Sequence, residues 1–123
     1  MHATLAWFEI PTIEFERAKE FYEHILDGEI SLMETPDTTY GFLPFTPEKG
    51  GVSGSIVYNA DHKPSNDGVR IYIDAGDQME VILGRVIPAG GSVILPRTDT
   101  GGNGFFALFQ DTEGNLIGLH SQD

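Results

Sequence analysis

The sequence contains no cysteine, so disulfide bonds, thiolate metal ligands and a cysteine nucleophile are all excluded. It has no apolar run near the roughly 18 residues that a membrane-spanning helix needs. Its first residues show neither the basic segment nor the apolar segment of a signal peptide. We therefore expect a cytoplasmic protein with no membrane partner.

Basic residues are scarce, with 7 Lys and Arg against 19 Asp and Glu, for a formal net charge of −12. Such a surface repels the phosphate backbone of nucleic acids, so we expect no nucleic-acid partner. The charge favours solubility but does not identify a ligand. The length of 123 residues fits a single domain, 1–123, that is large enough to build a core without covalent cross-links.

The sequence repeats itself at an offset of 63 residues. Identical pairs in one frame without gaps include Ile10/Ile73, Gly28/Gly91, Gly41/Gly104, Phe42/Phe105 and Gly51/Gly114. Two copies of one supersecondary unit would each leave an apolar sheet face uncovered, so they must pair. We therefore expect module one at about 1–60 and module two at about 68–123, with the functional cavity between them.

In the first module, the apolar and aromatic residues of 5–10 predict a strand. A helix with one apolar face follows and ends at Gly28. Three strands are then predicted at about 29–34, 39–45 and 53–59, with proline and glycine marking the turns between them. The order is strand, helix and three strands.

The second module repeats this order. The predicted strands are about 69–74, 92–95, 104–110 and 115–121, and the helix between the first two ends at Gly90 and Gly91. Asp77 and Glu80 fit a capping box that opens this helix, and Pro88 should end it early.

Two polar stretches complete the chain. The connector at 59–67 is poor in apolar residues and should lie on the surface. The glycine-rich stretch at 97–104 predicts a mobile hairpin loop rather than a phosphate site, because it joins two strands and does not open a helix.

Two motifs connect the chain to a known family. The run Arg17-Ala18-Lys19-Glu20-Phe21-Tyr22 resembles the first helix of the glyoxalase, bleomycin-resistance and extradiol-dioxygenase superfamily, often called the vicinal oxygen chelate fold. The run Asp111-Thr112-Glu113-Gly114-Asn115 is similar to the family's Asp-Pro-x-Gly-Asn turn, with threonine in place of the usual proline. This resemblance implies an α+β fold of two paired β-α-β-β-β modules that form a curved mixed sheet around a cleft. It also implies a homodimer, in which the partner can complete the cleft.

Metal-dependent members of this family place one ligand on the first and the last strand of each module. The corresponding positions here are Trp7, Ser55, Arg70 and Gly118, and an alternative register puts Gly68 in place of Arg70. None of these residues is a histidine or a carboxylate, whereas a tightly held catalytic metal needs three or four protein donors. We therefore expect no metal site at these positions and no other cofactor.

Strand parity divides the inner strands into two faces. One face is uniformly apolar and suits a covering of helices. The other face carries Trp7, Glu9, Ser55, Val57, Arg70, Tyr72, Gly118 and His120. Such a mixture of aromatic and polar groups is typical of a small-molecule pocket. The candidate ligand-binding residues are Trp7, Ser55, Arg70 and Tyr72.

Glu9 and His120 are the candidate catalytic residues. A buried Glu9 could act as a general base, because burial makes a carboxylate more basic. Arg70 would then be either its structural ion-pair partner or the group that holds an anionic substrate. His120 lies either at the surface or in the site, and a dyad of Ser55 with His120 would require the right geometry.

Two classes of function stay open at this point. The first is a metal-independent, glyoxalase-related enzyme that acts on a small oxygenated or carbonyl compound. The alternative is a non-catalytic protein that sequesters a planar or cationic ligand between Trp7 and Tyr72, which the acidic surface would favour. Arg70 in the same cleft argues against a cationic ligand unless Glu9 neutralises it.

Overall fold

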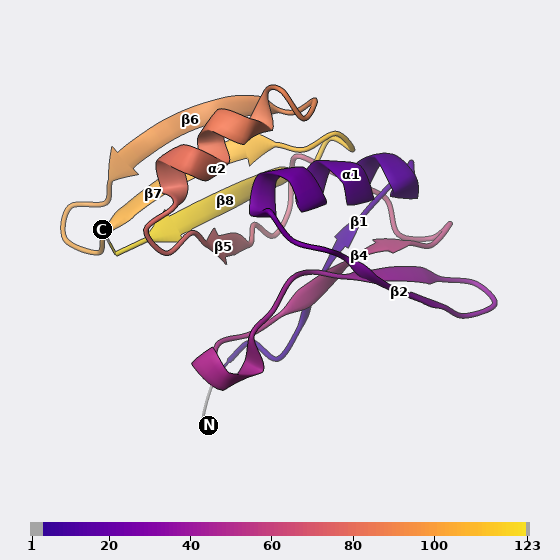
Figure 1. Cartoon of the computed structure of the whole chain (residues 1–123). Helices are drawn as coiled ribbons and strands as arrows, with labels where there is room; N and C mark the ends of the chain where they lie inside the picture. The colour runs from indigo at the N-terminus through magenta and orange to yellow at the C-terminus, as the bar shows by residue number, and fades with distance from the viewer. Residues whose placement is uncertain (1–3, 123) are drawn as a thin grey trace.

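The structure, a computed structural model, describes residues 4–122 and contains two β-α-β-β-β modules (Figure 1). The elements of module one are β1 (Phe8–Pro11), α1 (Phe15–Leu26), β2 (Ser31–Glu34), β3 (Thr39–Phe42), a short 3-10 helix (Pro47–Lys49) and β4 (Gly54–Tyr58). Those of module two are β5 (Tyr72–Asp74), α2 (Met79–Val86), β6 (Ser92–Asp99), β7 (Phe105–Gln110) and β8 (Leu116–Ser121). The fold class predicted from the sequence is therefore confirmed.

Each module forms its own mixed sheet of four strands. The strand orders are β1-β4-β3-β2 and β5-β8-β7-β6. In both sheets the first and last strands of the module, β1 with β4 and β5 with β8, pair in parallel, and the other pairs are antiparallel. The two sheets thus have the same topology, which is the structural counterpart of the sequence repeat.

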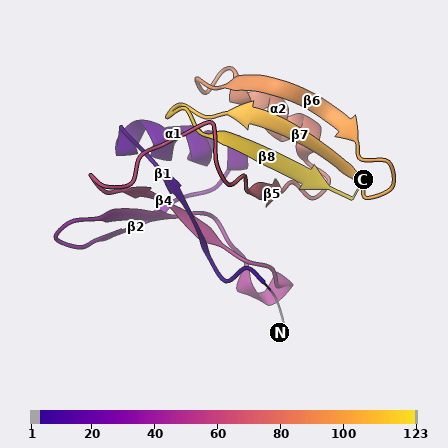
Figure 2. The ribbon, with the colours of Figure 1, turned by 180° about the vertical axis from the view of Figure 1, so that it is seen from behind.

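A single hydrophobic core lies between the two sheets. It joins Ile10 and Ile56 of the first sheet to Phe109 and Leu119 of the second. Helix α1 supplies Phe21, whose ring centroid lies 5.9 Å from that of Phe109. Because the helix-side faces of both sheets meet in this core, their other faces point away from it (Figures 1 and 2). Figure 2 shows the uncovered face of the second sheet in front of α2.

Glu113 of module two caps the first helix of module one. Its carboxylate accepts hydrogen bonds from the Ile13 N–H at 2.8 Å, the Glu14 N–H at 2.7 Å and the Arg17 Nε–H at 2.7 Å. The N-cap residue of α1 itself, Glu14, makes no side-chain capping bond. Burial opposes ionisation of Glu113, but Arg17 and the N–H donors together hold its pKa below the usual value.

Asp111, in the same turn, ties α1 and β1 to module two. The Tyr22 hydroxyl donates to Asp111 Oδ2 at 2.6 Å, and Asn115 Nδ2 donates both to Asp111 Oδ2 and to the Pro11 carbonyl oxygen. Burial raises the pKa of Tyr22 well above its usual value, and the charge of Asp111 raises it further. The motif that carries the family resemblance therefore holds the two modules together.

Several local predictions require correction. The capping box of Asp77 and Glu80 does not form, because α2 begins at Met79 after an N-cap residue, Gln78, that makes no side-chain capping bond. The first strand begins at Phe8, and β6 extends to Asp99, so the glycine-rich loop is shorter than predicted.

No helix within residues 4–122 is long and apolar enough to cross a membrane.

The ungapped frame of the repeat is wrong for the third strand of each module. Ser55 pairs with Phe42 across β4 and β3, whereas its counterpart Gly118 pairs with Leu108 across β8 and β7. The structural counterpart of Phe42 is therefore Leu108 and not Phe105. The frame does hold for the parallel pairs β1–β4 and β5–β8, which share one register.

Candidate ligand-binding sites

The residues predicted to line one site are divided between two modules. Trp7, Glu9 and Ser55 share the uncovered side of the first sheet, since Glu9 is paired with Ser55 and Trp7 has the same strand parity. Tyr72 and His120 share the uncovered side of the second sheet, where they pair with Gly118 and Asp74. Because both sides point away from the common core, one chain does not bring these two groups together.

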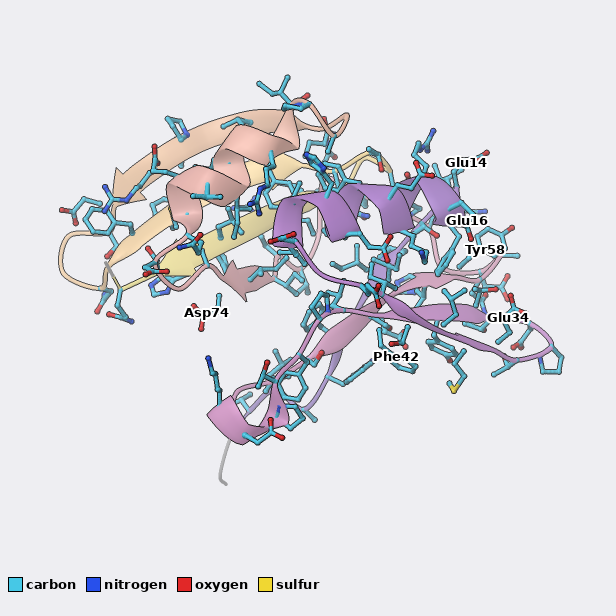
Figure 3. The ribbon with its side chains drawn as sticks, viewed as in Figure 1. Glu14, Glu16, Glu34, Phe42, Tyr58 and Asp74 are labelled. Atoms are coloured by element: carbon cyan, nitrogen blue, oxygen red, sulfur yellow. The ribbon has the colours of Figure 1, made fainter. Side chains whose placement is uncertain are left out.

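Three aromatic rings lie side by side on the uncovered face of module one. The Trp7 and Phe42 ring centroids are 5.7 Å apart in an edge-to-face arrangement, and the Tyr40 ring is stacked 6.3 Å from Phe42. Figure 3 shows Phe42 on the side of the sheet away from α1. The prediction from the inner strands missed Tyr40 and Phe42, although their alternation in β3 was a usable signal. We call these rings, with Glu9 and Ser55, the aromatic face.

Ser55 lies beneath the rings of the aromatic face. Trp7 precedes β1 and Phe42 lies on β3, the two strands that flank β4, so their rings meet above the strand that carries Ser55. Ser55 is fully buried, and its Oγ has no hydrogen-bond partner within the described part of the chain. A buried hydroxyl without a partner costs about 1–3 kcal/mol. A ligand that offers a hydrogen bond at this position would recover that cost.

Glu9 is solvent-exposed at the edge of the aromatic face, beside Ser55. The predicted ion pair between Glu9 and Arg70 does not form, and neither residue has a salt bridge to any residue in the 4–122 range. Glu9 is exposed, so the buried general base considered from the sequence does not form. Its charge is instead free to attract a cation at the edge of the aromatic face.

On the uncovered face of module two, the Tyr72 ring packs against the neighbouring strand. The Tyr72 ring lies over Gly118, where an added Cβ would stand 2.2 Å from Tyr72 Cδ2, and it has a tilted contact with Phe106. His120 Nε2 lies 2.7 Å from the Asn103 carbonyl oxygen, so this nitrogen donates a hydrogen bond to the loop between β6 and β7. His120 therefore holds the loop at the edge of the sheet.

The acid–base arrangements considered from the sequence do not assemble within one chain. The dyad of Ser55 and His120 does not form within one chain, because Ser55 Oγ has no partner and His120 bonds to the loop. Glu9 and His120 lie on different sheets whose uncovered faces point away from the core. Among the residues that the structure describes, no group of three or more His, Asp or Glu is placed to hold a metal ion.

A cavity of about 960 Å³ lies between the two modules. Of the sequence-predicted site residues, it is lined by Arg70 and Tyr72, while Trp7, Glu9, Ser55 and His120 lie outside it. The cavity is partly walled by Lys49 and Arg85, which the sequence-based prediction missed because the cavity forms only when the modules pack together. The cationic and the acidic candidates are thus placed in separate sites.

Comparison with known proteins identifies the family. The profile of the glyoxalase/bleomycin resistance protein/dioxygenase superfamily matches residues 4–119. The chain belongs to this superfamily. The resemblance inferred from the helix and turn motifs is therefore confirmed over nearly the whole sequence. No curated protein matches the chain.

Solved structures of superfamily members share the fold. A glyoxylase/bleomycin resistance protein/dioxygenase domain from Frankia sp. EAN1pec superimposes with a TM-score of 0.74 at 14% identity, covering 98% of both chains. A family enzyme from Burkholderia phytofirmans PsJN gives 0.69 at 14% identity, covering 98% of this chain and 100% of that one. The trypanothione-dependent glyoxalase I of Leishmania major gives 0.69 at 19% identity, covering 98% and 87%. At these identities the likeness shows the fold alone.

Proposed function

We propose that this superfamily member binds a small, planar organic cation on the aromatic face, without a tightly bound metal and without chemistry. The observation that carries the proposal is the Ser55 hydroxyl, which is fully buried and has no partner beneath the rings of Trp7 and Phe42. The exposed ring of Trp7 and the half-buried rings beside it offer stacking and cation–π contacts to such a ligand. This is the sequestering alternative considered from the sequence.

The charge distribution favours a cation at this face. Glu9 is exposed beside Ser55, and the chain carries a net charge of −12. Arg70, which argued against a cationic ligand, lines the cavity between the modules and has no bond to Glu9. Within one chain, the arginine therefore lies at a different site from the aromatic face.

A homodimer is part of the same proposal. Large apolar side chains stay exposed on both uncovered faces, with Trp7 at 42%, Met33 at 46% and Tyr72 at 46% of their full exposure. In the proposed two-fold dimer, module one of each copy covers module two of the other copy. This arrangement would bury these side chains in both copies and would turn each aromatic face into a cleft. Sedimentation velocity should then give the mass of two chains.

Fluorescence titration tests ligand binding directly, because Trp7 is the only tryptophan in the chain. We expect the planar cation ethidium to quench Trp7 emission with saturation, and the uncharged planar compound phenanthridine to bind more weakly. Glu9→Gln should weaken ethidium binding about three- to tenfold, the range of an exposed to a partly desolvated charge contact. Ser55→Ala should weaken a ligand that donates or accepts a hydrogen bond there, without lowering the stability of the fold.

The matched control is Glu16→Gln, which removes the same charge from an exposed position on α1, on the other side of the first sheet (Figure 3). If Glu9→Gln and Glu16→Gln weaken ethidium equally, only the net charge matters and the aromatic face is not the site. Saturable quenching that Glu9→Gln lowers and Glu16→Gln leaves unchanged would support it.

A further inference from the structure

The cavity between the modules is a second candidate site, separate from the aromatic face. Its walls are largely apolar and come from both sheets and both helices, namely Phe8, Leu26, Leu43, Ile71, Ile73 and Ile82. At about 960 Å³ its volume lies at the upper end of the range of about 300–1,000 Å³ that is usual for small-molecule sites. Trp7, Glu9 and Ser55 do not line it.

Cations are concentrated at this cavity. Lys49, Arg70 and Arg85 all line it, in a chain that has only 7 Lys and Arg and a net charge of −12. Arg85 donates a hydrogen bond of 3.3 Å to the Ile25 carbonyl oxygen, which turns its guanidinium toward α1. The side chains of Lys49 and Arg70 have neither a salt bridge nor a hydrogen bond to any described residue.

The acidic residues of the cavity wall form no salt bridge with these cations. Asp27 and Asp74 also line the cavity, and the salt bridges of the described residues, Arg17 with Glu113 and Lys19 with Glu23, lie elsewhere. Asp74 accepts a hydrogen bond from the Gly76 N–H instead. The wall therefore carries three cations against two anions, in a chain that is otherwise strongly acidic.

We infer that this cavity binds an amphipathic anion, a molecule with a hydrocarbon part and one carboxylate. The hydrocarbon part is held by the apolar wall, where burial of each methylene group is favourable. Arg70 receives the carboxylate through its two parallel N–H donors, and Lys49 adds a second charge-assisted hydrogen bond. This ligand class is opposite in charge to the one proposed for the aromatic face, and the two sites are independent.

Isothermal titration of the full chain at low salt, with decanoate and with decyltrimethylammonium, tests the inference. The two probes share one alkyl chain and differ in the sign of the head group. The net charge of −12 attracts the cation and repels the anion everywhere except at a local cluster of positive charge. We expect decanoate to bind one per chain, at least about tenfold more tightly than decyltrimethylammonium.

The variant Arg70→Gln with Lys49→Gln should weaken decanoate about tenfold or more, since each lost contact is a charge-assisted one. Both side chains are exposed and unpaired, so the variant should fold. The control Lys63→Gln removes an exposed cation of the connector, outside the cavity, and should leave decanoate binding unchanged.

Three results would overturn the inference. Decyltrimethylammonium could bind as tightly as decanoate, which would show that the alkyl chain alone is recognised. Decanoate affinity could be the same in the double variant as in the parent. Decanoate could also fail to bind a chain that sediments as a dimer, which would show that a second copy occupies the cavity.

Discussion

The two sheets have the same topology, but their uncovered faces carry different side chains. The difference lies at two pairs of equivalent positions. Ser55 in module one corresponds to Gly118 in module two, and Glu9 corresponds to Tyr72. In module two, the absence of a Cβ at Gly118 lets the Tyr72 ring lie on the strand, so the ring covers the position that corresponds to Ser55. In module one, the serine stays beneath two rings and its hydroxyl is unused.

This contrast indicates how a duplicated fold can have a single binding face. Gly118 offers a ligand no polar side chain, whereas a buried hydroxyl without a partner and a free carboxylate leave interactions that a ligand can complete. The repeat that makes the modules alike thus does not make them equivalent in function, because function depends on the side chains at a few positions.

The largest expected effect is a loss of stability when the turn that joins the two modules loses the carboxylate of Glu113. Glu113→Ala removes the acceptor for the Ile13 and Glu14 N–H groups and for Arg17, and should lower the free energy of unfolding by about 3 kcal/mol. Chemical denaturation at neutral pH measures the change. Arg17→Gln should cost no more than about 1 kcal/mol, because the Arg17 side chain is 49% exposed. Equal losses in the two variants would contradict the capping role of Glu113.

A smaller loss of stability should follow when the glycine of module two is given a Cβ, as at the equivalent serine of module one. Gly118→Ala places a methyl group where the Tyr72 ring lies, and should destabilise the chain by about 1–2 kcal/mol while the ring is displaced. In a Tyr72→Ala background the same change should cost clearly less, because the obstructing ring is gone. Thermal denaturation of the four proteins gives the coupling energy. Additive losses would show that Tyr72 does not depend on the glycine.

The smallest expected effect is a pH dependence of the contact that joins the modules. Because the folded pKa of Glu113 is lowered, its contribution to stability is complete above the ordinary glutamate pKa of about 4.3. The contribution is lost as the pH falls through the lower folded value. Urea unfolding from pH 7 to pH 3 should therefore show a steeper loss in the parent than in Glu113→Gln. Parallel curves would mean that other carboxylates account for the acid loss.

Much of the fold was predictable because it depends on local patterns. The 3.6-residue apolar spacing at Ala18, Phe21, Tyr22 and Ile25 placed α1, and the glycine and proline turns placed most strands to within a few residues. The predictions failed where a contact between residues far apart in the sequence decides the local structure. Glu113 caps α1 from the far end of the chain, and the frame of the repeat shifts at β7 because strand pairing, not sequence spacing, sets the register.

The candidate site was only partly predictable. Strand parity correctly placed Trp7, Glu9 and Ser55 on one face, because the alternation of side chains is a local property of a strand. Parity could not show that Arg70 would lie in a cavity away from Glu9, since that depends on how the two sheets are arranged around one core. Tyr40 and Phe42 join the face only because β3 pairs with β4.

By itself, the sequence determined the family, the two β-α-β-β-β modules, the acidic surface and the sides on which the strand residues lie. These features follow from composition, from periodicity and from short motifs, all of which act over a few residues. The tertiary structure decided that the two uncovered faces point away from a shared core, that Ser55 is buried without a partner, and that the free cations surround a separate cavity. The physical reason is that pairing of the modules through α1 and the turn at Asp111 to Asn115 depends on contacts between residues about 100 positions apart, such as Ile13 with Glu113.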